Sequence, residues 1–538
     1  MLPAAHPDDI NRYRAQGWWS ETTLSQRVAE LAKNHPTQSA YIWGDTQITW
    51  HGYSALADSI AHRLAGERVA QGDRALVWLP DGGAIHAAFL GCERAGVVAV
   101  GAGWRAGVRE LKYLAQRTNA TVLIVADETF AGSAREICAL LDIQRVIVMH
   151  DLDGHPTVSG GALAPTGGSG IAAHELWLLN STSGTTGLPK CVMQTQNRWE
   201  YFHHKAVEFG ALHDVEVWMS VVPAPFGFGL WTSHVSPTLL GVPCVVSPRF
   251  SASQTVADIE RHGVTVLAAV SSQFVMIMNA AADRDLSSLR VLFTGGEAIS
   301  PARAREFEDR FGCMVLNFYG SNETGLLSGT RVTDAVEARF TTGGCVVPEM
   351  NVRLYDEFGN RIPGDRGRGR PACKGPATTL GYWDDVSANA ELFTQDGWMF
   401  MGDIVDIDTD GWLSVVARTA DFIIRGGKNI SAPAVEDEVA SHPAVCLAAA
   451  VPVPDERLGE LVGVFVELLP GAALDLEQLV TYLRDRGVSR EWWPERLWVV
   501  AELPRSSGGK VAKGELRALV LPGSDADVAG EAVVSPNN

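Results

Sequence analysis

The sequence predicts an α/β protein made of a large N-terminal domain with parallel-rich sheets and flanking helices, followed by a small α+β domain. In the first 150 residues, helix-like segments with apolar residues at 53, 56, 60 and 64 alternate with short apolar runs such as RALVWLP. Repeated helix–strand units favour a parallel sheet covered by helices. From about residue 420, a helix, two strands and a further helix form a unit large enough to fold separately.

Composition excludes several classes of protein. The 538 residues are 46% hydrophobic and 20% charged, which is typical of a packed globular protein and not of a disordered chain. The 44 Lys and Arg against 63 Asp and Glu give a net charge of −19, which disfavours binding to nucleic acid or anionic lipid through bulk charge. An anionic small molecule would need backbone N–H groups, a few placed cations or a metal.

The cysteines and the uncharged stretches indicate a cytoplasmic protein without a membrane span. The eight cysteines show no zinc-ligand spacing, so we expect reduced, mostly buried thiols, and MLPAAHPDDINRYR lacks the features of a signal peptide. Prolines divide the uncharged stretch Val217–Pro248, which favours strands and turns. The second uncharged stretch, His262–Ala282, predicts a buried strand followed by a helix.

The segment STSGTTGLPK, Ser181–Lys190, follows the strand-like run ELWLLN. Its hydroxyls and glycines allow backbone N–H and O–H groups to surround phosphate oxygens, and Lys190 supplies positive charge. It is not a Walker A loop, because Cys191 stands where Ser or Thr would bind Mg²⁺. A flexible linker is the alternative. The predicted phosphate-binding residues are Thr182, Ser183, Gly184, Thr185, Thr186, Gly187 and Lys190.

Two further glycine-containing segments, Thr294–Glu297 and Asn317–Gly325, follow the strand-like runs LRVLF and CMVL. The carboxyl ends of strands are where open α/β sheets bind ligands. Tyr319 can stack on a flat base, and Glu323 can hold Mg²⁺ bound to phosphates. Taken alone, each segment is equally compatible with a simple turn.

Two segments nearer the C-terminal end also carry suitable chemistry. Asp403 and Arg418 flank a predicted hairpin turned at Asp410-Gly411, where a carboxylate can bind a ribose diol and the arginine can reach the sugar or a phosphate. A surface ion pair is the alternative. Pro504–Lys510 is a polar turn that carries a lysine, and by itself it predicts only a solvated loop.

These five segments, in this order, resemble the adenylate-forming superfamily of acyl-CoA synthetases, adenylation domains and luciferases. The resemblance covers residues 45–520, and STSGTTGLPK is its most specific element. YGSNE, MGD, ARTADFIIRGGKNI, PRSSGGKVAKGELR and the GYW at 381–383 also match family motifs.

The resemblance implies a division of labour along the chain. Residues 1–419 would bind ATP and a carboxylic acid, residues 420–522 would form a mobile domain carrying the catalytic Lys510, and residues 523–538 would be a disordered tail. Glu323 would act in catalysis as the ligand of Mg²⁺. The remaining nucleotide contacts would come from Gly295, Gly296, Glu297, Asn317, Tyr319, Gly320, Asn322, Asp403 and Arg418.

The acid and CoA sites are implied by resemblance in the same way. An apolar acid pocket would be lined by Phe226, Phe228, Trp231 and Ser272, and pantetheine would pass Gly426, Gly427 and Lys428. The chain departs from the family pattern at Asn322, where Thr is usual; at Gly227, where His is frequent; and at Ala420, where Asp or Lys is common. The N-terminal NRYRAQGWW resembles ligases of aryl, cyclohexane-carboxylate-like or medium-chain acids.

The expected reaction is therefore ATP-dependent formation of an acyl-adenylate and transfer of the acyl group to CoA, with Mg²⁺ as cofactor. The closest alternative is an enzyme that loads the acyl group onto a carrier-protein phosphopantetheine. A luciferase-like oxygenase and a non-catalytic nucleotide-binding homologue are more distant alternatives. The sequence leaves formation of a homodimer open.

Overall fold

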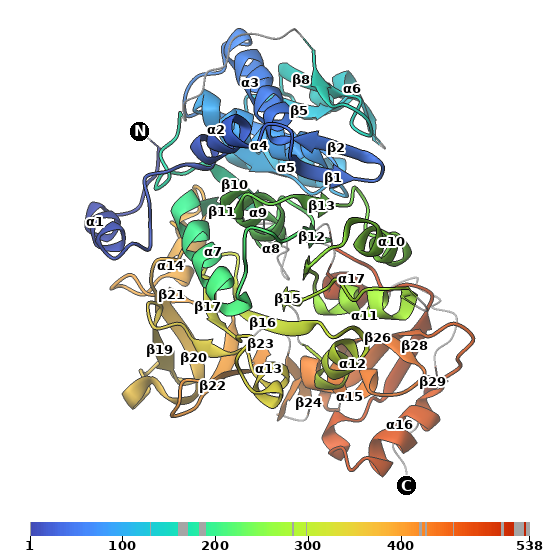
Figure 1. Cartoon of the computed structure of the whole chain (residues 1–538). Helices are drawn as coiled ribbons and strands as arrows, with labels where there is room; N and C mark the ends of the chain where they lie inside the picture. Colours follow the sequence, from blue (N-terminus) through green and yellow to red (C-terminus); the bar gives the residue numbers. More distant parts are fainter. Residues whose placement is uncertain are drawn as a thin grey trace.

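The structure is a computed structural model that describes residues 2–129, 131–159, 170–181, 190–281, 284–296, 299–418, 422–425, 428–455, 457–506, 510–520 and 532–533. It confirms the predicted α/β class, with a large sheet-rich N-terminal part and a smaller C-terminal part (Figure 1). None of the helices in these ranges is long and apolar enough to cross a lipid bilayer.

The first sheet has seven strands, parallel in the centre and antiparallel at both edges, and it is drawn in blue to teal in the upper half of Figure 1. Alternate side chains of the parallel strands enter opposite apolar clusters, one shared with α3 and α4 and the other with α5 and α6. The predicted helix–strand repeats are therefore confirmed. The strands, in spatial order, are β11 (Cys191–Gln194), β10 (Leu178–Ser181), β4 (Val98–Gly101), β3 (Arg74–Trp78), β5 (Val122–Ala126), β8 (Arg145–His150) and β9 (Thr157–Val158), and the helices are α3 (Trp50–Gly66), α4 (Gly83–Ala95), α5 (Val108–Thr118) and α6 (Ala134–Leu140).

The second sheet has nine strands and a parallel centre. One face shares the apolar core of the first sheet, and the other is covered by α10, α11 and α12. Its strands, in spatial order, are β18 (Cys345–Val346), β17 (Gly325–Gly329), β16 (Met314–Ser321), β15 (Val291–Gly295), β14 (Val266–Ala268), β12 (Trp218–Ser220), β13 (Cys244–Val246), β1 (Ser39–Trp43) and β2 (Thr46–Thr49). The associated helices are α2 (Leu24–Asn34), α7 (Gln196–Gly210), α10 (Ala252–His262), α11 (Ser271–Ala280), α12 (Pro301–Phe311) and α13 (Val336–Thr341), and α1 (Pro7–Ala15) precedes them all.

The two uncharged stretches differ in outcome. The second forms β14 and α11, as predicted. The first contains the expected strands, β12 and β13, but the segment between them is helical where turns were expected, and it is made of α8 (Gly227–Gly229), a π-helix (Leu230–Val235) and α9 (Ser236–Leu240). Pro237 lies in the first turn of α9, where proline removes no required hydrogen bond, so it does not break the helix.

A third, antiparallel sheet completes the N-terminal part and is drawn in yellow and orange at the lower left of Figure 1. It contains the hairpin that was predicted at Asp410-Gly411. Its elements are β19 (Asn351–Tyr355), β20 (Gly367–Lys374), β21 (Met399–Phe400), β22 (Asp403–Ile407) and β23 (Leu413–Arg418), with α14 (Val386–Leu392) beside it.

The C-terminal part is built on a six-stranded sheet with apolar clusters on both faces. The long hairpin of β26 and β27 forms its centre, and α15 and α16 cover one face. Residues 532–533 form a short strand within the expected tail, whose remainder lies outside the described residues. The elements are β24 (Phe422–Arg425), β25 (Lys428–Ser431), α15 (Ala432–Ala440), β26 (Val445–Asp455), β27 (Gly459–Leu468), α16 (Leu476–Asp485), β28 (Arg496–Val500), α17 (Lys513–Leu519) and β29 (Ala532–Val533).

Candidate active site

Several of the predicted site residues that the structure describes lie around the carboxyl ends of β15 and β16. These strands are parallel neighbours, and Gly295 lies opposite Phe318. β16 is longer than CMVL suggested: it continues to Ser321, turns back through residues 322–324 and pairs with β17, with an irregular register between Tyr319 and Gly320. The YGSNE motif is therefore the end of a strand and the turn of a hairpin, not a loop after the strand.

Tyr319 connects the second sheet to the third. Its hydroxyl donates a hydrogen bond to Asp403 Oδ2 at 2.8 Å. Asp403 begins β22, and its partner in the register with β23 is Arg418. The backbone thus brings Asp403 and Arg418 side by side, as the hairpin predicted, although the Arg418 side chain lies outside the described structure.

Glu323 and Lys190 both contact Tyr382, which the sequence marked only as part of the GYW motif. The Tyr382 hydroxyl donates to Glu323 Oε1 at 2.8 Å, and Lys190 Nζ lies 4.9 Å from the centre of the Tyr382 ring. Burial raises the pKa of the Tyr382 hydroxyl, which keeps it protonated as a donor. Glu323 Oε2 has no hydrogen-bond partner among the described residues, so one carboxylate oxygen is left for a ligand.

A buried cation, Arg198 of α7, lies beneath Glu323. It is 1% exposed and donates to the backbone oxygens of Asn322 and Glu323, each at 2.9 Å, and to Ala377 O at 2.7 Å. Burial lowers the pKa of Arg198 to about 9, and the nearby Glu323 opposes this shift. Sequence analysis missed this residue, because nothing in its local pattern distinguishes a buried arginine from an exposed one.

Asn322 belongs to a buried amide cluster that the sequence also did not predict. Its Nδ2 donates to Asn180 Oδ1 at 2.8 Å, and its Oδ1 accepts from Gln194 Nε2 at 3.0 Å and from Asn180 Nδ2 at 3.2 Å. A Cβ atom added at Gly227 would overlap Asn322 Oδ1. The two departures from the family pattern, Asn322 and Gly227, are therefore in contact.

Lys510 reaches this region from the C-terminal part. Its Nζ donates to Gly296 O at 2.9 Å, directly beyond the end of β15. Asn317 directs its side chain elsewhere, since its Nδ2 donates to Thr342 O at 3.0 Å. The structure thus joins Lys510 to Gly296, while Asn317 supports the neighbouring backbone.

The residues predicted for the acid pocket occupy different environments. Phe226 and Phe228 are half-buried, but Trp231 is 0% exposed and stacks on Phe202 with ring centres 4.1 Å apart. Ser272, at the start of α11, accepts a hydrogen bond at 3.4 Å from Arg505 of the C-terminal part. Phe226 and Phe228 therefore lie nearer the surface, with Trp231 packed in the core.

Asp81 supports the loop that leads to Phe226. Its Oδ1 accepts a hydrogen bond from the backbone N–H of Ala224 at 2.8 Å. Burial raises the pKa of Asp81 to about 7, against a smaller opposing effect of that hydrogen bond. The carboxyl therefore changes its charge near neutral pH.

Several predicted residues lie outside the described structure: Thr182, Ser183, Gly184, Thr185, Thr186, Gly187, Glu297, Gly426 and Gly427. Lys428 is described only through its backbone, at the start of β25 opposite Arg425. His203 of α7 is buried with Nδ1 3.2 Å from Ser236 Oγ, and burial lowers its pKa to about 3, so it has a structural environment.

All eight cysteines are free, as predicted, and six are buried. Cys345 and Cys446 are partly exposed, and partial burial raises the pKa of both thiols.

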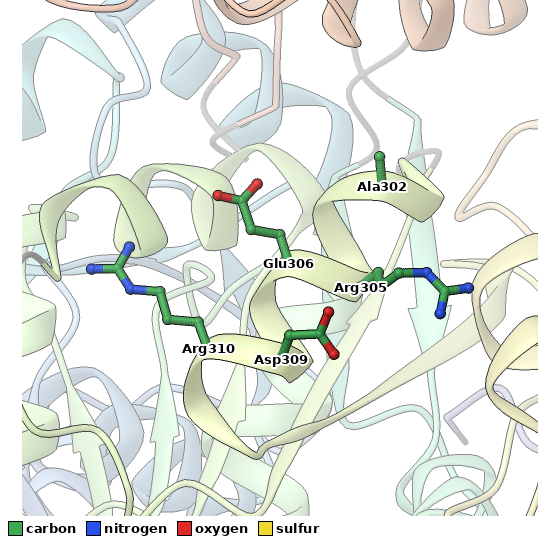
Figure 2. A pocket seen from close by; sticks show the side chains of 5 residues that line it. All are labelled: Ala302, Arg305, Glu306, Asp309 and Arg310. Atoms are coloured by element: carbon green, nitrogen blue, oxygen red, sulfur yellow. The ribbon is translucent and has the colours of Figure 1, made fainter.

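A separate shallow hollow on α12 contains none of the predicted site residues. Figure 2 shows that its lining comes from one helix and carries mixed charges, with the residues Ala302, Arg305, Glu306, Asp309 and Arg310.

Two family models match the chain. The model described as AMP-binding enzyme matches residues 28–383, and the model described as AMP-binding enzyme C-terminal domain matches residues 434–510. Together they include Lys190, Glu323, Tyr382 and Lys510.

Relatives and solved structures agree with these matches. The chain is 31% identical to a 2-hydroxy-7-methoxy-5-methyl-1-naphthoate–CoA ligase of Streptomyces carzinostaticus, over 95% of this chain and 96% of the relative. It is 32% identical to a salicyl-AMP ligase / salicyl-S-ArCP synthetase of Mycobacterium tuberculosis, over 95% and 93%. The structure of an anthranilate CoA ligase in complex with anthranoyl-AMP superimposes with a TM-score of 0.82, at 23% identity, over 94% of this chain and 98% of that one.

Proposed function

The chain belongs to the family of AMP-binding enzymes, and from this premise we propose that it activates a carboxylic acid with ATP and transfers the acyl group to CoA. The products are an acyl-CoA thioester, AMP and pyrophosphate. The observation that carries the proposal is the position of Lys510, whose Nζ lies 2.9 Å from Gly296 O, beside the strand ends that carry Glu323 and Tyr319.

In the first step, a carboxylate oxygen of the acid attacks the α-phosphorus of ATP, and the bond from that phosphorus to the bridging oxygen of pyrophosphate breaks. Two anions meet in this transition state, so a cation between them lowers the barrier. Lys510 is the cation we assign to this task. Asp403 holds the ribose hydroxyls, with Tyr319 and Arg418 beside it, and Gly295, Gly296 and Glu297 border the adenine.

Ser181–Lys190 would hold the phosphates, and Glu323 would hold a Mg²⁺ ion. The residues fit this metal, because Glu323 Oε2 is a hard oxygen ligand with no partner among the described residues, while Oε1 is fixed by Tyr382. When bound, Mg²⁺ offsets the charge of the departing pyrophosphate. Arg198 keeps the Glu323 backbone in place, and Lys190 adds positive charge beside the Tyr382 ring.

In the second step, the thiolate of CoA attacks the acyl carbonyl carbon, and the bond to the AMP oxygen breaks. We assign residues 420–522 to a mobile domain that presents Gly426, Gly427 and Lys428 to pantetheine in this step, and residues 1–419 to the domain that keeps the adenylate. When the smaller domain moves, Lys510 leaves the nucleotide site and the segment that contacts pantetheine takes its place. The closed site limits hydrolysis of the acyl-adenylate.

The acid is proposed to be an aryl carboxylic acid. The relatives named above act on naphthoate and salicylate, and the half-buried Phe226 and Phe228 offer flat apolar surface for a ring. The free thiols fit a reducing compartment, so we place the enzyme in the cytoplasm.

A second acceptor is supported by one specific observation. The Mycobacterium tuberculosis relative is named both as an AMP ligase and as a synthetase for an ArCP thioester. Transfer to the phosphopantetheine of a carrier protein uses the same thiol chemistry as transfer to CoA.

One experiment separates these proposals. The purified enzyme is incubated with ATP, Mg²⁺ and a panel of aryl and medium-chain acids, alone, with CoA or with a phosphopantetheinylated carrier protein. We expect acid-dependent ATP–pyrophosphate exchange, and CoA-dependent release of AMP with formation of a thioester. If exchange occurs and the carrier protein is loaded but no CoA thioester forms, the acceptor is the carrier protein and not CoA. If no acid supports exchange, the proposed adenylation is refuted.

A further inference from the structure

The two parts of the chain meet on one face of helix α11. Ser272, Met276 and Asn279 lie at the i, i+4 and i+7 positions of this helix and therefore share a face. Arg505 donates from Nη1 to Ser272 Oγ and from Nη2 to Met276 Sδ, both at 3.4 Å. Asn279 Nδ2 donates to Cys446 Sγ at 3.7 Å. We call this contact, made of Ser272, Met276, Asn279, Arg505 and Cys446, the α11 face.

The α11 face includes an apolar contact beside its hydrogen bonds. Met276 packs against an apolar cluster that otherwise belongs to the C-terminal part, with Leu447, Phe465, Trp498, Leu503 and Leu516 among its members. Figure 1 shows α11 beside β26 and α17 of the C-terminal part. The face is therefore a packed junction between the two parts.

Arg505 and Lys510 lie on the same tight hairpin. Arg505 pairs with Val511 in an antiparallel bridge, Ser506 N donates to Lys510 O at 2.7 Å, and Ala512 N donates to Pro504 O at 2.7 Å. One strand of the hairpin thus contacts α11 through Arg505, and the opposite strand contacts Gly296 through Lys510. A hairpin fixed at both points holds the ammonium group in one place.

We propose that Arg505 is a positioning residue for the adenylate-forming step: by docking on the α11 face it holds the Lys510 hairpin at the nucleotide site. The proposal rests on the proposed function. The contacts of Arg505 with Ser272 and Met276 are to a neutral hydroxyl and a thioether, which are individually weak and readily broken. In the domain movement proposed above, the α11 face is closed for the first step and opens for transfer to the thiol.

Arg505→Ala tests the proposal through the two half-reactions. ATP–pyrophosphate exchange is expected to fall about tenfold, mainly in kcat, because the reacting groups are less well aligned. Transfer from chemically prepared acyl-AMP to CoA is expected to stay within about twofold of wild type. Arg505→Lys, which keeps a donor for Ser272, should recover part of the exchange activity.

Arg457→Ala is the matched control. Arg457 is an exposed arginine of the same part of the chain, at the turn between β26 and β27. Arg457→Ala also removes one positive charge, but at a position away from the α11 face, so it should leave both half-reactions unchanged. Equal loss of both half-reactions in Arg505→Ala, or loss of neither, would overturn the proposal. An inactive wild-type enzyme would instead refute the proposed function.

A crosslink tests the opening of the α11 face directly. Asn279→Cys places a thiol beside Cys446, and a short bis-maleimide joins them by thioethers that CoA cannot reduce. The joined protein is expected to keep ATP–pyrophosphate exchange and to lose transfer to CoA at least tenfold. The same variant carrying Cys446→Ser, treated identically, should keep both. Failure of the two thiols to join, or full transfer activity in the joined protein, would contradict the proposal.

Discussion

Tyr382 makes two contacts at once, a hydrogen bond to Glu323 and a ring contact with Lys190. The hydroxyl fixes one carboxylate oxygen and so orients the other. Groups that orient a metal ligand in this way commonly change metal affinity when they are removed. Tyr382 should therefore tune the dependence on Mg²⁺ without touching the acid.

Tyr382→Phe keeps the ring beside Lys190 and removes the hydroxyl from Glu323. We expect the Mg²⁺ concentration for half-maximal ATP–pyrophosphate exchange to rise roughly threefold to tenfold. The KM for the acid should change little. An unchanged Mg²⁺ dependence, measured by titration at saturating ATP, would show that the hydrogen bond does not orient Glu323.

Asp81 predicts a pH dependence of stability. Its folded pKa of about 7 lies above the usual value of an aspartate, so folding favours the protonated form. Its stabilising effect is complete at low pH and is lost as the pH rises towards and through 7. Asp81→Asn keeps an acceptor for Ala224 N and carries no charge. The variant should be more stable than wild type by about 1–3 kcal/mol at pH 8 and equal to it near pH 4.

This prediction is checked by urea unfolding at several pH values. A stability difference that does not change between pH 4 and pH 8 would show that Asp81 does not titrate in this range.

At the scale of elements, the turn between β16 and β17 packs directly on the start of the helical segment 227–240. Asn322 fills the space that a side chain at Gly227 would need. The amide is held there by Asn180 and Gln194, so it cannot move aside without losing hydrogen bonds. The side chain at position 322 therefore limits the size of the side chain that position 227 can hold.

Gly227→Ala should destabilise the protein by about 1–3 kcal/mol, because the added methyl group overlaps a fixed amide oxygen. In the background of Asn322→Ala the same substitution should cost much less. Chemical denaturation of the two single variants and the double variant measures this coupling. Additive effects would mean that the two side-chain positions do not compete for space.

The sequence predicted the elements with clear periodicity or turn chemistry. The helix beginning near Trp50, the strand–helix pair after His262 and the hairpin at Asp410-Gly411 are examples. The helical segment at 227–240 was not predicted, because its proline was expected to break a helix. Pro237 lies in the first turn of α9, where a helix tolerates proline. The sequence could place Lys190, Glu323 and Asp403 on motifs, but not Arg198, Asn180 or Gln194. Those contacts depend on which distant segments pack together, and no local pattern encodes that.

At the scale of the whole molecule, the net charge of −19 opposes binding of the two anionic substrates of the proposed reaction, ATP and CoA. Binding of these anions must therefore depend on a few positively charged side chains placed close to them. Arg198 and Lys190 belong to the N-terminal part, whereas Lys510 reaches Gly296 from the C-terminal part. In the proposed mechanism, the first half-reaction therefore depends on the arrangement of both parts.

Lys510→Ala should lower ATP–pyrophosphate exchange by roughly 10²-fold or more, since a transition-state cation is removed. Transfer of the acyl group from prepared acyl-AMP to CoA should persist. Both rates are measured on the same preparation. Adenylation within a few-fold of wild type would show that Lys510 is not the catalytic cation.

The two partly exposed thiols give the enzyme a built-in conformational gauge. Cys345 lies on β18, next to the backbone oxygen of Asp410, whereas Cys446 faces Asn279 of α11. Under the proposed movement of residues 420–522, alkylation of the unmodified protein would mark both, and the ratio of the two labels, read by peptide mass spectrometry, would report the fraction of molecules with the C-terminal part docked. Because Cys345 serves as the internal standard, that fraction could be followed in a crude extract, as each substrate is added, without any engineered residue.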